Sequence, residues 1–75
     1  MRDLVYFTRF EDLEDGRWRL HVEGPTSASY GPFSAAEDRG MTEHRTFQRW
    51  KAKARSRGGD AHIRERGVWV VLLPD

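Results

Sequence analysis

The residues in this sequence best suited to bind another molecule are basic side chains in a window that contains no acid. The window runs from His44 to Gly59 and is predicted to be mostly helical. Its cations have no carboxylate four residues away, and like charges at that spacing repel each other by a few tenths of a kcal/mol. Either water simply screens this repulsion, or an anionic partner relieves it. The cations expected to contact such a partner are Arg45, Arg49, Lys53 and Arg57.

Other reactive residue types form no known catalytic or metal-binding arrangement. The three histidines, His21, His44 and His62, share no ligand motif, and the chain has no Cys. The serines stand in predicted turns or at a helix start, where Ser is common for conformational reasons. We therefore expect no catalytic residue, no cofactor and no metal, and we expect that the protein is not an enzyme.

Two strands are predicted in the first third of the chain. Leu4–Phe10 is rich in aromatic and β-branched side chains and has apolar residues on both faces. Arg17–Glu23 alternates apolar and polar side chains, which is typical of an antiparallel strand with one face in water. Gly24–Phe33 contains two Gly and two Pro and is predicted to be a loop.

One main helix is predicted in the middle of the chain. Ser34 and Glu37 have the spacing of a capping box, and Thr42 is a second plausible helix start. The main helix is expected over residues 42–57, because the two glycines that follow favour helix termination.

The last third of the chain is predicted to be extended. Ala61–Glu65 and Val68–Leu73 form either a hairpin or one bent strand. The whole pattern predicts a single α+β domain over residues 1–75. Its sheet has three or four antiparallel strands with one helix packed on one face, in the order β-β-α-β or β-β-α-β-β. The expected core residues are Trp18, Leu20, Phe47, Trp50, Trp69 and Val71.

A single helix can cover only one face of this sheet. Val5 and Phe7 then lie on the uncovered face. Either the loop residues Tyr30 and Phe33 fold over that face, or an apolar patch is left for another chain, since monomers seldom expose large apolar patches. The candidate protein-binding residues are Val5, Phe7, Tyr30 and Phe33.

Residues 16–37 contain a strand Trp followed by a Gly-Pro turn, and then Gly-Pro-Phe before a helix start. This run resembles the arm-type DNA-binding domain of phage tyrosine integrases. The resemblance implies a small sheet whose exposed residues enter a DNA groove. Carried onto this sequence, the residues that would face the groove are Arg17, Arg19 and His21.

Composition ranks the possible functions. The net charge is only +1, whereas dedicated nucleic-acid domains are usually more basic. We therefore first expect a non-catalytic protein-interaction module that docks through its sheet face and has an Arg-rich rim. Such a module could be a regulator or inhibitor of phage type, and its partner could be another protein or a second copy of this chain. A nucleic-acid-binding module is the alternative. The preference for Arg over Lys favours a GC-rich bacterium or its phage, and the absence of a membrane span or signal-peptide pattern favours the cytoplasm.

Overall fold

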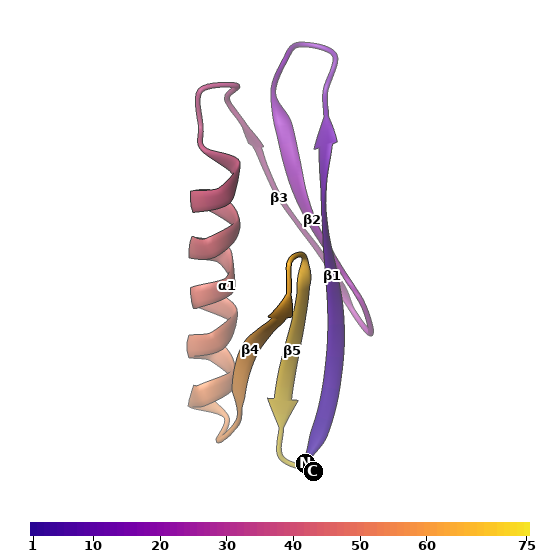
Figure 1. Cartoon of the computed structure of the whole chain (residues 1–75), viewed down its shortest axis with the longest axis vertical. Helices are drawn as coiled ribbons and strands as arrows, with labels where there is room; N and C mark the ends of the chain where they lie inside the picture. The colour runs from indigo at the N-terminus through magenta and orange to yellow at the C-terminus, as the bar shows by residue number, and fades with distance from the viewer.

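The computed structural model describes all 75 residues as five strands and one helix (Figure 1). The molecule is elongated, 43 × 19 × 18 Å in its Cα extents, and its two termini lie together at one end. No helix is long and apolar enough to cross a membrane. In chain order the elements are β1 (Arg2–Asp12), β2 (Trp18–Glu23), β3 (Ser27–Phe33), α1 (Arg39–Ser56), β4 (Asp60–Glu65) and β5 (Val68–Leu73).

The five strands form one antiparallel sheet in the order β3-β2-β1-β5-β4. The long central strand β1 uses different halves for its two neighbours. Residues Phe7–Asp12 pair with β2, and residues Arg2–Phe7 pair with β5. The sheet is therefore staggered along β1, and α1 connects the edge strand β3 to the opposite edge strand β4.

One face of the sheet packs against α1, as the sequence predicts. The ring of Phe47 lies 5.3 Å from that of Trp69, and the ring of Trp50 lies 4.7 Å from that of Tyr6, both edge to face. Such contacts contribute beyond simple area burial. The predicted core is confirmed: the cluster contains Trp18, Leu20, Phe47, Trp69 and Val71, with Trp50 partly buried against it.

The segment predicted as a loop is in fact a third strand at the edge of the sheet, so the sheet has one strand more than expected. In β3, Tyr30 pairs with Leu20, and Phe33 pairs with Trp18. Both aromatic side chains pack against the core, which favours extended backbone over the turns that Gly and Pro indicate. An edge strand tolerates these residues because one side of its backbone needs no partner strand.

The helix begins three residues before the predicted boundary, and its cap differs from both predicted ones. The Asp38 carboxylate accepts a hydrogen bond from the backbone N–H of Met41 at 2.8 Å, so Asp38 is the N-cap. Ser34 and Glu37 form a separate turn, in which the N–H of Glu37 donates to the Ser34 carbonyl.

The C-terminal segments form a hairpin, one of the two predicted alternatives. Gly67 has the positive φ of 76° that its turn requires. At the other end of β4, the chain passes very close to β5. A Cβ at Gly59 would lie 1.9 Å from the Leu72 carbonyl oxygen, so only a glycine fits at this position between α1 and β4.

Candidate binding surfaces

Ion pairing divides the cations of the chain into a paired and an unpaired group, and the unpaired group includes three residues outside the helix: Arg2, Arg64 and Arg66. Arg9 on β1 pairs with Glu23, and Arg39 at the start of α1 pairs with Asp12. Two candidate residues, Arg17 and Arg19, pair with Asp15 and Glu11. The remaining candidates form no ion pair. These four, called the helix row below, are Arg45, Arg49, Lys53 and Arg57.

The other two cations of the acid-free window belong to a different part of the helix surface. Lys51 and Arg55 both approach the carboxylate of Asp60, at 4.0 Å and 3.2 Å. The pKa of Asp60 is held below its ordinary value of 3.8, chiefly by a hydrogen bond from the backbone N–H of Ala61 and then by these two cations. Asp60 thus offsets part of the positive charge on one side of α1, whereas no acid offsets the charge of the helix row.

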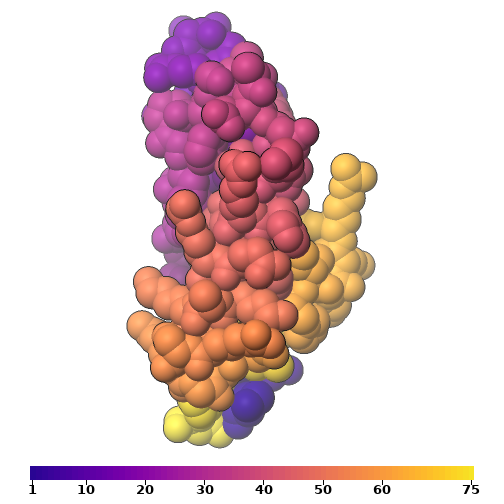
Figure 2. Space-filling view, turned by 90° about the vertical axis from the view of Figure 1, so that its left-hand side faces the viewer, coloured from indigo at the N-terminus to yellow at the C-terminus, as the bar shows by residue number.

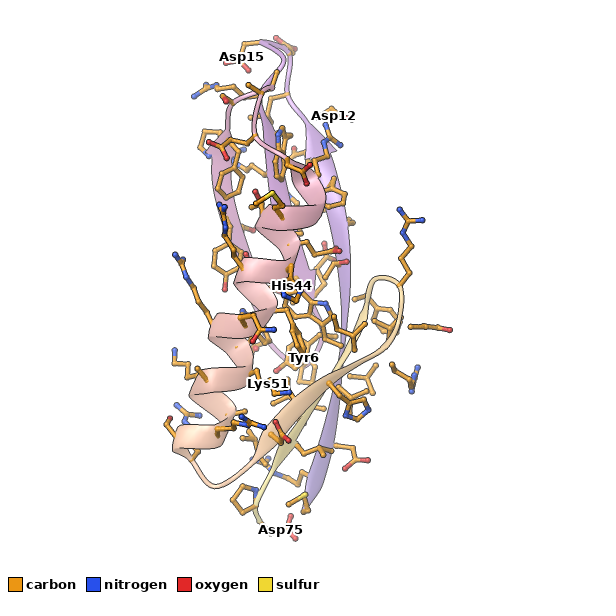
Figure 3. All side chains as sticks on the ribbon, turned by 60° about the vertical axis from the view of Figure 1, so that its left-hand side comes forward. Tyr6, Asp12, Asp15, His44, Lys51 and Asp75 are labelled. Carbon is orange, nitrogen blue, oxygen red and sulfur yellow. The ribbon has the colours of Figure 1, made fainter.

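The helix row runs along the side of α1 that faces away from the β4–β5 hairpin. Residues four apart on a helix are separated by about 6 Å along its axis and turned by only about 40°, so the row is a shallow spiral. All four side chains are exposed. Figure 3 shows nitrogen-tipped side chains that extend from α1 on this side, whereas Lys51 lies toward the hairpin.

A groove of about 440 Å³ lies between the second half of α1 and the sheet, beside the helix row. Three members of the row, Arg49, Lys53 and Arg57, belong to its lining, and no acidic residue does. In Figure 2, side chains of the second half of α1 project on the side where β3 lies. The rest of the lining is mostly apolar: Leu4, Tyr6, Thr26, Ala28, Tyr30, Trp50, Ala54, Val71 and Leu73.

Two hydrogen bonds join the walls of the groove. The indole N–H of Trp50 on α1 donates to the hydroxyl of Tyr30 on β3 at 2.7 Å. The hydroxyls of Tyr6 and Thr26 lie 3.2 Å apart. The Tyr30 hydroxyl accepts from Trp50, so its own hydrogen is free to donate to a ligand.

The face of the sheet opposite α1 is not covered by any segment of the chain. Val5 and Phe7 lie there, and Phe7 is 55% exposed. Tyr30 and Phe33 do not cover this face, because both pack on the helix side. Val68 and Val70 pair with Phe7 and Val5 but are themselves buried, so the exposed apolar surface is small and centred on Phe7.

The polar half of the open face contains a cluster that the sequence pattern missed. His21 is hydrogen-bonded to Ser29 through Nδ1 and to Glu11 through Nε2, both at 2.8 Å. The bond with His21 is the main reason that the pKa of Glu11 lies below its ordinary value of 4.5. The sequence does not reveal this cluster, because Gly and Pro predict a loop around Ser29, whereas the structure pairs Ser29 with His21 in the sheet.

This cluster connects three neighbouring strands, β1, β2 and β3, across the sheet. It combines a hydroxyl, an imidazole and a carboxylate, as hydrolases do. However, Ser29 is exposed on the edge strand, and none of the three residues lines the groove beside α1 or the recess at the start of α1. We therefore assign it a structural role in holding the strands. No group of three or more His, Asp or Glu side chains is placed to hold a metal ion.

No protein-family model, curated protein or solved structure matches this chain. Function is therefore inferred from the geometry of the two surfaces.

Proposed function

We propose that this protein is a non-catalytic nucleic-acid-binding module that contacts phosphates through the helix row. The observation that carries the proposal is the absence of any ion pair at Arg45, Arg49, Lys53 and Arg57, on a helix whose other two late cations share Asp60. A row of cations without acids is the usual footprint of a protein that binds a phosphate backbone.

The charge pattern favours the helix over the sheet as the binding surface. The exposed face of β2 contributes Arg19, but Glu11 lies 3.9 Å from it, and Arg9 on the neighbouring strand is paired with Glu23. Polyanion binding there would have to compete with these carboxylates. The helix row offers its charges without that competition, and the resulting attraction is independent of the nucleotide sequence.

The test compares two double substitutions that change the net charge equally. Arg49→Ala with Lys53→Ala removes half of the helix row. Lys51→Ala with Arg55→Ala removes two cations from the same helix that are already paired with Asp60. Affinity for a labelled oligonucleotide is measured by fluorescence anisotropy, after nucleic acid that co-purifies has been removed with salt.

We expect the first variant to bind about tenfold more weakly, since each exposed contact contributes less than about 1 kcal/mol. The second variant should remain within about threefold of the unmodified protein. If both variants lost affinity for the oligonucleotide equally, only the net charge would determine binding, and the proposal would be wrong.

A second candidate function, protein interaction through the open sheet face, is favoured by the exposure of Phe7. Sedimentation of the pure protein over a concentration series tests it in its simplest form, self-association. If the face docks a second copy, the unmodified protein dimerises and Phe7→Ser stays monomeric. If the unmodified protein stays monomeric at all concentrations, self-association through this face is ruled out.

A further inference from the structure

We infer that the groove beside the helix row holds unstacked bases, so that the protein binds single-stranded nucleic acid in preference to duplex. This inference rests on the proposed function, because the helix row must first hold the phosphate backbone. It adds a second, apolar component of recognition that duplex nucleic acid cannot use.

The arrangement of charge and apolar surface in the groove supports this choice of ligand. Arg49, Lys53 and Arg57 line the groove together with aromatic and aliphatic side chains, and no acid interrupts them. Proteins that bind single strands combine a positively charged groove with aromatic or apolar surface on which bases stack. The cations disfavour a purely apolar ligand, and a small inorganic anion would gain nothing from contact with the apolar lining.

The size of the groove agrees with an organic ligand group. Its volume of about 440 Å³ lies within the range of small-ligand sites, about 300–1000 Å³. Trp50 and Tyr30, one from each wall, are half-buried and so retain some accessible ring surface. The free hydrogen of the Tyr30 hydroxyl provides a donor for a base carbonyl or a phosphate oxygen.

A duplex cannot use this groove in the same way. Its bases are stacked on one another and their faces are not available to the protein. A duplex would therefore contact only the projecting cations of the helix row. A single strand whose backbone follows the row can turn its bases inward over the apolar floor.

The experiment places a carboxylate inside the groove and, as a control, on the opposite face of the same strand. Ala28 lines the groove from β3, whereas Ser27 is exposed on the open face and pairs with Glu23. Ala28→Glu and Ser27→Glu change the net charge equally. Each full-length variant is titrated with an oligothymidine of about 16 nucleotides, a single-strand length that such modules cover, and with a duplex of the same length.

We expect the unmodified protein to bind the single strand about tenfold more tightly than the duplex, the contribution of one stacked base. Ala28→Glu should abolish this preference, and Ser27→Glu should keep it. Equal affinity for the two nucleic acids would overturn the inference but leave the proposed function intact, provided that loss of Arg49 and Lys53 still weakens both. Tighter binding of polyglutamate than of oligothymidine would overturn both in favour of an acidic protein partner.

Tryptophan fluorescence of the unmodified protein gives a readout that needs no variant to fold. Trp18 and Trp69 are each only 1% exposed, whereas Trp50 is accessible at the groove. Oligothymidine should therefore quench the fluorescence, and the duplex should leave it unchanged. Binding of oligothymidine without quenching would place the bases outside the groove.

Discussion

Trp50 connects the core of this protein to its candidate binding site at the level of a single residue. Its ring contacts Tyr6 at 4.7 Å and Trp69 at 5.6 Å, while its indole N–H bonds to Tyr30 across the groove. The sequence predicts its core role, because Phe47, Trp50 and Ala54 share one arc of the helix. Its second role at the groove depends on Tyr30, which comes from a segment predicted to be a loop.

Trp50→Ala should lower the free energy of unfolding by about 3 kcal/mol, the lower end for large aromatic residues because the side chain is half-buried. Chemical denaturation measures this loss, with Arg49→Ala as an exposed control that should change stability by less than about 0.5 kcal/mol. A folded Trp50→Ala variant that lost less than about 1 kcal/mol would contradict the packing described.

At the scale of the elements, Asp60 fixes the end of α1 to the start of β4. Its carboxylate accepts hydrogen bonds from the N–H of Ala61 at 2.8 Å and from Arg55 at 3.2 Å. Both favour the ionised acid in the folded state, which is why its pKa is lowered from 3.8. The stabilisation is therefore complete at pH values above the unfolded pKa and is lost as the pH falls through the folded one.

Asp60→Asn should lower the melting temperature at neutral pH, because the amide loses the charge that attracts Arg55 and Lys51. The difference from the unmodified protein should shrink as the pH falls below the ordinary pKa of 3.8, where the native acid is also neutralised. Thermal unfolding followed by circular dichroism across this range measures it. A difference that stayed constant down to the lowest pH would show that the ion pairs contribute nothing.

Some elements of the fold can be predicted from the sequence, and others cannot. Regular alternation in Trp18–Glu23 predicts a strand because burial there follows the strand period. The unbroken apolar run Val68–Leu73 predicts a central strand, and its first four residues are all buried. The strand Ser27–Phe33 is not predictable from Gly and Pro content, since its pairing depends on the neighbouring β2. The helix cap is missed for a similar reason: several hydroxyl and carboxylate side chains precede the helix, and local sequence alone does not select Asp38.

At the scale of the whole molecule, the sequence indicates only some features of the candidate site. The acid-free window indicates where cations gather, and it contains all four members of the helix row. It does not indicate which cations remain unpaired, because Asp60 reaches Lys51 and Arg55 only in the folded chain. Nor does it indicate the groove, whose walls come from three strands and the helix.

Charge and shape are therefore organised on two different sides of one elongated molecule. The open sheet face has paired charges around a small apolar centre, whereas the helix side has unpaired cations beside an apolar groove. A net charge of +1 hides this contrast, because the acids and the free cations lie in different places. Local charge, and not net charge, determines where a polyanion can bind.

The salt dependence of oligothymidine binding tests the helix row most directly. Each phosphate contact on a single strand contributes about −0.7 to the slope of log K against log[salt], so four contacts predict a slope of about −2.8. Removal of Arg49 and Lys53 should bring the slope to about −1.4, while removal of Lys51 and Arg55 should leave it near −2.8. Two results would contradict the assignment of the helix row as the phosphate-binding surface. One is the same slope in all three proteins, and the other is a slope that changes equally in the two variants.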